Sequence, residues 1–404
     1  MKTLKFYFVL LCVLSISSGN IVCNAQNNIQ LGDIEMVNLG DKQLYAHKRG
    51  DYDAPINGKT RIITGVTTEY IDAEFKDGFA VGNWEYYANN NKMAVMNYVD
   101  GYLDGEFSEY YSGGGLEIKG YYLKGQKHGT WETFNGDGTI KLMEVYENDK
   151  IAKIISYHTN GSVDRERNFK NGKEHGFDKQ YTSEGTLKSE RNYVDGKQVG
   201  PQTQFYLSNA GDYTQKSSYN EQGQLDGSFS EIYESTGTVK IKGHYLKGQK
   251  HGTWETFKND GVIKLTEVYE NDKVTKKITY YTDGSVERER GLKDGKDHGL
   301  DKQYTFEGTL KSEKNYVNGK QVGPQMQFYS SNAGNYIQKS NYNEQGQLDG
   351  SFSEIYESTG TVKTKGKYKN GRKDGKWTYG YSHALYKEEI YEDGKLTETI
   401  QLNK

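Results

Sequence analysis

The stretch GQKHGTWETF at residues 125–134 decides the fold, because it recurs letter for letter at residues 248–257. It joins a glycine-bounded turn to a short aromatic strand, and weaker versions of it fill nearly everything after Gly58. Self-similarity at a short, fixed period is the signature of a repeat architecture. We therefore expect an array of similar small elements in place of a globule with one thick core.

The composition favours a thin sheet. Hydrophobic residues make up 34% of the 404 residues, whereas the chain holds 35 Tyr and 48 Gly. Tyrosine rings pack through their bodies while their hydroxyls stay in water, so they can cover a thin sheet. Only 3 Pro occur, which argues against a disordered low-complexity chain.

The repeat reads G-x-W-x-x-Y, three or four residues, G-x-L, five residues, Y-x-x-G and three residues. About 13 to 14 copies of 23–27 residues account for residues 58–404. Their starts are Gly82, Gly105, Gly129, Ala152, Gly176, Gly200, Gly227, Gly252, Thr275, Gly299, Gly323, Gly350 and Gly375.

Each repeat carries two turn signals, a mid-repeat glycine as in NGDGT (residues 135–139) and the Y-x-x-G ending as in YLKG (residues 122–125). Such pairs favour the positive φ angles of tight hairpin turns. Only four to seven residues lie between turns, which suits strands and is too short for stable helices. The sequence predicts an all-β fold, an elongated, solenoid-like antiparallel meander of β-hairpin repeats.

A longer period lies on top of the repeat. Trp131, Trp254 and Trp377 are each 123 residues apart (254 − 131 and 377 − 254), so a block of about 123 residues is duplicated at 105–226 and 227–349. We call these the first and second blocks; a third copy is cut short. The drifting last repeat is expected to cap the open end, and residues 26–57, which follow no repeat, are expected to form an N-terminal lead-in or cap.

The first 25 residues predict a cleaved signal peptide. Lys2 and Lys5 precede an apolar run at residues 6–14 that is too short to span a bilayer, and cleavage is expected between Ala25 and Gln26. No other segment is apolar enough to cross a membrane. The mature chain is therefore expected to be secreted, periplasmic or at the cell surface.

Both cysteines, Cys12 and Cys23, lie in this peptide, so the mature chain is expected to have no disulfide, thiolate nucleophile or Cys-ligated zinc. A lipidated Cys23 is the less favoured alternative, since Val22 is a poor residue to precede it. Loss of Lys2 and Lys5 takes the formal net charge from −3 to −5. Charges of both signs are interspersed, so nucleic acid is not an expected partner.

These features resemble the MORN repeat superfamily, in particular its YwqK-type antitoxin-like variant. The resemblance covers residues 58–404 and rests on Gly129 with Trp131, on the second aromatic Phe134, on the Gly-x-Leu turn, and on endings such as Tyr193 to Gly196. It implies a β-hairpin solenoid that serves as an interaction scaffold, without catalytic residues or a cofactor. Members are linked to protein partners, membrane lipids and toxin neutralisation; the signal peptide departs from a cytosolic antitoxin.

A looser resemblance is to Gram-positive cell-wall-binding repeats, which alternate Trp, Tyr and Gly at about this spacing. In those repeats paired aromatics build a cage in every copy. Here tryptophan occurs only at Trp84, Trp131, Trp254 and Trp377, so most repeats would lack the cage. The four tryptophans are either structural or part of a binding strip, and packing is the favoured interpretation.

The equivalent positions of other repeats show whether a polar residue is required for a function. His128 and His251 precede the leading glycine, but the same slot holds Val199 and Asp226 in other repeats, so we interpret it as a turn position and not as a metal or base site. Asp164 with Glu166, and Glu287 with Glu289, are carboxylate pairs on one strand face at ~7 Å, a spacing that glycoside hydrolysis can use. The alternating Arg165 and Arg167 favour an ordinary charged strand instead.

We find no catalytic, cofactor or metal motif in the sequence. The expected function is a non-enzymatic, secreted or envelope interaction scaffold that binds a protein or an envelope component, with glycans or lipid headgroups as further ligands. An envelope glycan-binding or glycan-processing protein and a toxin-neutralising antitoxin or immunity protein are the alternatives.

Overall fold

The computed structural model describes residues 27–40, 42–65, 68–209, 211–332, 334–381 and 383–402. The expected leader and its cleavage site at Ala25 and Gln26 lie outside these residues. The chain divides into two compact parts, Met1–Gln198 and Val199–Lys404, which we call the N-terminal and C-terminal parts and describe separately.

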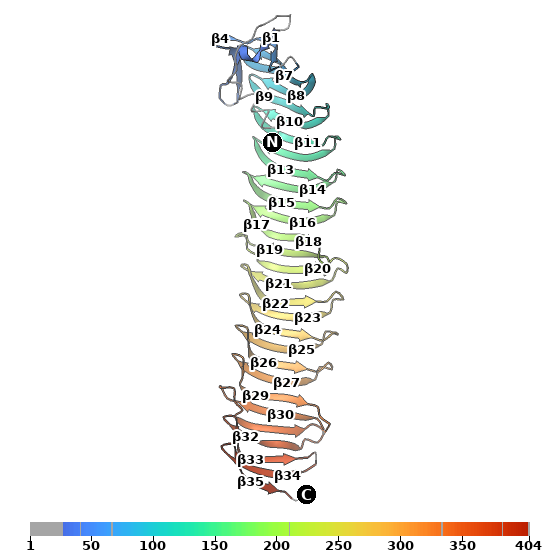
Figure 1. The fold of residues 1–404 in the computed structure, drawn as a ribbon, viewed down its shortest axis with the longest axis vertical. Coiled ribbons are helices and arrows are strands. Elements are labelled where there is room, and N and C mark those ends of the chain that lie inside the picture. The colour runs from blue at the N-terminus through green and yellow to red at the C-terminus, as the bar shows by residue number, and fades with distance from the viewer. Residues whose placement is uncertain are drawn as a thin grey trace. The chain divides into compact units, whose positions relative to one another are not determined.

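The N-terminal part is an open antiparallel meander in which almost every strand pairs with the strands before and after it (Figure 1). Its strands are β1 (Asn27–Gln30), β2 (Ile34–Asn38), β3 (Leu44–Lys48), β4 (Asp51–Pro55), β5 (Gly58–Ile63), β6 (Tyr70–Lys76), β7 (Phe79–Ala88), β8 (Asn91–Val99), β9 (Tyr102–Tyr110), β10 (Leu116–Leu123), β11 (Gln126–Phe134), β12 (Ile140–Glu147), β13 (Lys150–Tyr157), β14 (Val163–Lys170), β15 (Lys173–Tyr181), β16 (Leu187–Val194) and β17 (Lys197–Gln198).

The C-terminal part continues the same pattern of sequential antiparallel pairs. Its strands are β18 (Gly200–Tyr206), β19 (Tyr213–Tyr219), β20 (Gly227–Tyr233), β21 (Val239–Leu246), β22 (Gln249–Phe257), β23 (Ile263–Glu270), β24 (Lys273–Tyr280), β25 (Val286–Lys293), β26 (Lys296–Tyr304), β27 (Leu310–Val317), β28 (Lys320–Gln321), β29 (Gly323–Tyr329), β30 (Tyr336–Tyr342), β31 (Gly350–Tyr356), β32 (Val362–Lys369), β33 (Arg372–Gly380), β34 (Leu385–Glu392) and β35 (Lys395–Gln401).

The predicted all-β hairpin meander is confirmed. Within the described residues the one helical element is a 3-10 turn, η1, at Leu31–Asp33. Outside residues 27–55, every described strand belongs to the meander of its part, and no second layer of described residues packs on it. The sheet must therefore find its packing between neighbouring hairpins.

The Y-x-x-G endings form the predicted tight turns. Leu123 pairs with Gln126 around Lys124 and Gly125, whose φ angles are 46° and 75°. Positive φ at both central residues is the type I′ geometry, and its twist matches that of the flanking strands. The turn amide of Gly125 also donates to the carbonyl of Leu103, one repeat earlier, at 2.7 Å.

The leading glycine of the repeat lies inside a strand and does not bound a turn. Gly129 has a φ of 66° within β11, beside a shift in register against β10 between Lys119 and Tyr121. A bulge at a positive-φ glycine bends a strand without ending it. For this reason β11 runs for nine residues and β12 for eight, longer than the predicted four to seven.

Residues 27–55 form short strands against the first hairpins. Strand β1 pairs with β5 in parallel, the exception to the antiparallel rule. The backbone amides of Leu44 and Ala46 donate to the turn carbonyls of Gly101 and Gly78, each at 2.7 Å. Ala46 is fully buried, in a cluster that includes Trp84. This segment covers the start of the repeats and shares one apolar cluster with the first hairpins.

Candidate functional site

Each tryptophan is the centre of an aromatic cluster. The Trp254 ring lies 5.3 Å from that of Phe229 and 5.0 Å from that of Tyr245, and its Nε1 donates to the carbonyl of His244 at 3.2 Å. The ring lies directly over Gly243, where an added Cβ would come within 2.2 Å of it. The same arrangement recurs around Trp131 in the N-terminal part.

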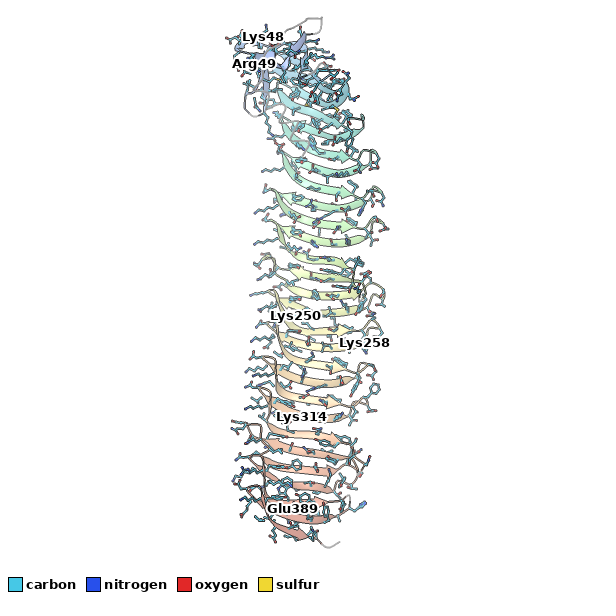
Figure 2. All side chains as sticks on the ribbon, viewed as in Figure 1. Lys48, Arg49, Lys250, Lys258, Lys314 and Glu389 are labelled. Carbon is cyan, nitrogen blue, oxygen red and sulfur yellow. The ribbon has the colours of Figure 1, made fainter. Side chains whose placement is uncertain are left out.

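A lysine completes the clusters of Trp131, Trp254 and Trp377. Lys250, labelled in Figure 2, places its Nζ 4.2 Å from the Trp254 ring centre and 5.1 Å from that of Tyr269. The equivalent Lys127 lies over Trp131, and burial lowers the pKa of its ammonium group. The tryptophans keep at most 4% of their surface exposed, so all four, Trp84 and Trp377 included, pack between hairpins.

Two of the repeats without tryptophan bury an ion pair in the same slot. Asp301 accepts hydrogen bonds from Nε and Nη2 of Arg288 at 2.8 and 2.7 Å, and its side chain is 4% exposed. This carboxylate raises the pKa of the Arg288 guanidinium. Arg165 and Asp178 form the identical fork in the N-terminal part. The slot is thus aromatic in some repeats and holds a buried ion pair in two others.

The polar candidates from the sequence do not assemble a catalytic site. Glu166 pairs with Lys153 at 2.7 Å, whereas Asp164 accepts from the Ser156 hydroxyl at 3.0 Å. Glu289 likewise pairs with Lys276 at 2.5 Å. Three of the four carboxylates therefore have a partner of their own, as the charged-strand interpretation expects, whereas Glu287 lines a hollow.

The interpretation of His128 and His251 as turn residues is wrong. Both lie within strands β11 and β22, just before the bulge glycine, because the strand continues through that glycine. Their Nδ1 atoms, like that of His175, are buried and have no hydrogen-bond partner among the described residues. No group of three or more His, Cys, Asp or Glu side chains in the described part of the chain is arranged to hold a metal ion.

The register places a row of side chains on one face of the C-terminal part. Trp254, Glu267, Lys277, Arg290 and Asp301 directly oppose one another on the successive strands β22 to β26. Directly opposed residues share a face. The aromatic cluster therefore passes, along one row, into a charged stretch.

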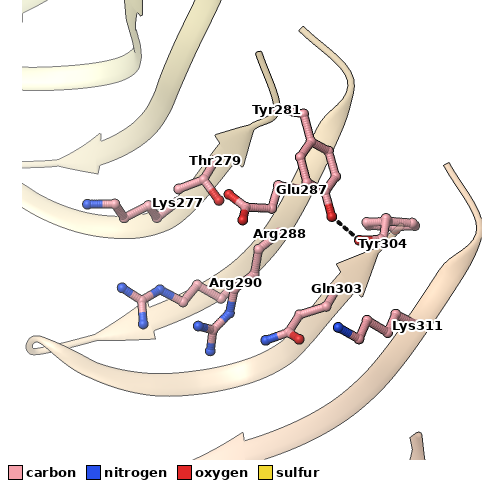
Figure 3. A pocket seen from close by; sticks show the side chains of 9 residues that line it. All are labelled: Lys277, Thr279, Tyr281, Glu287, Arg288, Arg290, Gln303, Tyr304 and Lys311. Carbon is pink, nitrogen blue, oxygen red and sulfur yellow. Dashed lines mark hydrogen bonds between the residues drawn. The ribbon is translucent and has the colours of Figure 1, made fainter. Parts of the chain in front are cut away.

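A hollow of about 280 Å³ opens in this charged stretch (Figure 3). Four cationic side chains and one carboxylate line it, together with hydroxyl and amide groups. The lining residues are Lys277, Thr279, Tyr281, Glu287, Arg288, Arg290, Gln303, Tyr304 and Lys311. Figure 3 shows the guanidinium groups of Arg288 and Arg290 next to each other. We call this the cationic hollow.

Like charges face each other in the cationic hollow. Lys277 lies directly opposite Arg290 in the pairing of β24 with β25, and like charges in that relation are destabilising. Each has a counter-ion to one side, since Lys277 Nζ is 3.3 Å from Glu267 and Arg290 Nη1 is 3.4 Å from Asp297. Among the residues that line the hollow, cations outnumber carboxylates four to one, so its wall is mostly cationic.

The other walls are fixed by hydrogen bonds. The Tyr281 hydroxyl donates to the carbonyl of Tyr304 at 2.8 Å, which holds its ring at the rim of the hollow. The fork to Asp301 fixes Arg288 through Nε and Nη2, and Nη1 takes no part in that fork. The hollow is thus shaped before any ligand arrives.

The first block contains an equivalent hollow position with different chemistry. At an offset of 123 residues the arginines, glutamine, second tyrosine and second lysine are retained, but Lys277 becomes Ile154 and Tyr281 becomes His158. Ile154 lies opposite Arg167, so this copy avoids the like-charge pair. The sequence analysis missed the cationic hollow. Its only signal was this difference between two nearly identical blocks.

Comparison with known proteins gives no relative that bears on function. No protein-family model and no curated protein matches the chain. The solved structures of TcdB2-TccC3 without its hypervariable C-terminal region and of TcdB2-TccC3-TEV align at 11% identity, with TM-scores of 0.15 and 0.14. The alignments cover 89% of this chain and 22% of those chains, and such scores carry no argument. Among the described residues, no helix has the length and apolar character needed to cross a membrane.

Proposed function

We propose that the chain is a non-enzymatic interaction scaffold of the MORN type, secreted or held at the cell envelope, that binds a protein or an envelope component. The observation that supports this most directly is the repetition of one face. The fork of Arg165 and Asp178 in the first block recurs as Arg288 and Asp301 in the second, with the flanking arginine and glutamine retained. A duplicated face adds valency, whereas duplication adds little to an enzyme with a single pocket.

The alternative of an envelope glycan-binding protein is supported by the mixed lining of the cationic hollow. Hydroxyl, amide and guanidinium groups converge there, and convergent polar groups in a concave site are typical of small-ligand recognition. Neither proposal requires a catalytic residue. They differ in whether the ligand is a polypeptide or a carbohydrate.

The test compares the intact chain with a one-block variant that lacks Thr130–Gly252. Both proteins are sedimented with insoluble cell-wall polysaccharide, and both are passed over immobilised envelope proteins. Because linked sites can gain 10²-fold or more in avidity, we expect the intact chain to be retained at least about tenfold more strongly on one of the two matrices. Competition by free sugar favours the glycan alternative. Equal retention of both proteins, or none, contradicts the scaffold.

A further inference from the structure

We propose that the cationic hollow of the second block binds the carboxylate of an acidic sugar, and that the equivalent position in the first block does not. This inference rests on the proposed function and names a ligand class for one of its faces. It follows from the charge, the lining and the size of the hollow, and from the comparison of the two blocks.

The charge calls for an anion. Lys277 and Arg290 oppose each other across two strands, and Arg288 and Lys311 line the same space. The first block shows that folding does not require this arrangement, because Ile154 takes the place of Lys277 there. An oxyanion between the two cations would relieve their repulsion, and a guanidinium matches the planar geometry of a carboxylate.

The remaining lining favours a ligand with hydroxyl groups. Glu287 also lines the hollow and would repel a second negative charge, but its carboxylate can accept hydrogen bonds from ligand hydroxyls. The Gln303 amide and the Thr279 hydroxyl both donate and accept, which suits the same chemistry. A polyphosphate would be attracted by the cations but repelled by the carboxylate of Glu287. A sugar ring with a single carboxylate satisfies both kinds of group.

The size and shape fit a single ring. The volume of about 280 Å³ lies at or below the roughly 300–1,000 Å³ of pockets that hold drug-sized ligands. Tyr281, held by its hydrogen bond to Tyr304, presents an aromatic ring at the rim, and a ring of this kind can pack against the apolar face of a sugar. In the first block His158 stands in this place.

The experiment measures binding of galacturonic acid, a single ring with one carboxylate, to the full chain by calorimetry, beside its uncharged methyl ester and inorganic phosphate. We expect one site per chain for the acid, and at least about tenfold weaker binding of the ester, because hydrogen bonds to a charged group are the strong ones. Lys277→Ile, which copies the first block, is expected to weaken binding of the acid by at least about tenfold. Lys276→Ile is the matched control, since it removes the same charge from the opposite face of the same strand and is expected to change binding less than twofold.

A gain-of-function variant guards against misfolding as an explanation. Ile154→Lys combined with His158→Tyr brings the two most different lining residues of the second block into the first, where Ser156 and Asp164 already resemble Thr279 and Glu287. We expect the number of acid sites per chain to rise from one to two. Equal binding of acid and ester, equal weakening by Lys277→Ile and Lys276→Ile, or phosphate binding as tight as that of the acid overturns the inference. None of these outcomes contradicts the scaffold proposal. That proposal is tested separately, by retention of the intact chain and the one-block variant on cell-wall polysaccharide and on immobilised envelope proteins.

Discussion

At the scale of single residues, one glycine of the repeat is required because a tryptophan ring packs directly against its backbone. Gly120 lies under the Trp131 ring, and an added Cβ would come within 2.2 Å of that ring, although its φ is not positive. We expect Gly120→Ala to destabilise the protein by about 1–3 kcal/mol, the usual range for overpacking. Denaturant midpoints measure this. Gly136→Ala is the control, because Gly136 has open space and no positive φ, and its free energy of unfolding should change by no more than ~0.5 kcal/mol. Equal shifts would refute the packing argument.

A second residue-scale prediction concerns Glu389, which is labelled in Figure 2. Lys387 Nζ and the Tyr391 hydroxyl each donate to its carboxylate at 2.8 Å. These bonds, that of Lys387 foremost, lower the pKa of Glu389 from 4.5 to about 2. A lowered folded-state pKa gives stability that is fully present above the unfolded pKa and is lost as the pH falls through the folded pKa.

We therefore expect Glu389→Gln to melt below the wild type at pH 7, and the gap to close between pH 4.5 and about pH 2. Melting curves at pH 7, 4.5, 3 and 2 measure it. Glu398→Gln, at an exposed position of β35, is the control and should melt with the wild type throughout. A gap that stays constant with pH would show that the carboxylate does not make the difference.

At the scale of the element, the bulge glycine sets the register of the hairpin. Gly129 has open space around its Cα but a φ of 66°, so its requirement is conformational and not steric. A non-glycine residue there costs about 1–2 kcal/mol. We expect Gly129→Ala to lower stability by that amount in the same denaturant series, and Gly136→Ala again to be neutral. If Gly129→Ala is neutral as well, the bulge tolerates ordinary residues and does not fix the register.

The bulge also explains what the sequence could and could not predict. An Asn-Gly pair such as Asn171 and Gly172 favours positive φ angles at both residues, and the structure has them. The hairpins, and with them the all-β class, can therefore be predicted from local sequence. The strand lengths do not, since a glycine inside a strand looks the same in sequence as one that ends it. For this reason His128 and His251 were predicted to lie in turns, although they lie in strands. The wide spacing of the tryptophans predicted that they pack in the sheet. Nothing in the sequence indicated that Asp301, at the equivalent position of another repeat, is buried in an ion pair.

At the scale of the whole chain, the cationic hollow is a feature that could not be predicted from the sequence. Its lining comes from strands β24 to β27, and which side chains converge depends on three successive registers, each with an irregularity. A one-residue error in any register moves a strand's side chains to the other face. The duplication supplies what local reasoning lacks, because a residue that differs between two nearly identical blocks is not dictated by the shared fold. Ile154 against Lys277 is such a difference.

Duplication also predicts that a whole block can be removed. Loss of Thr130–Gly252 joins Gly129 to Thr253 and brings Trp254 into the slot of Trp131. The two sites are interchangeable in geometry, since the distances to the neighbouring Phe and Tyr rings are 5.4 and 5.0 Å around Trp131 and 5.3 and 5.0 Å around Trp254. Stability in repeat proteins is roughly a sum of local and nearest-neighbour terms. We therefore expect the one-block variant to be soluble, nearly free of helix by circular dichroism, and cooperative in melting.

The matched control removes one residue more, Thr130–Thr253. Gly129 is then followed directly by Trp254, and the strand beyond the junction is shifted by one residue. Because side chains alternate between faces, this shift turns the tryptophan away from Gly120 and exposes the row that the sheet buries. We expect this variant to be insoluble or to lose its cooperative transition, although it differs from the one-block variant by a single threonine. If both deletions fold equally well, the bulge absorbs the shift and the register is not set at the leading glycine. If neither folds, stability depends on contacts beyond nearest neighbours, and the additive picture of the repeat fails.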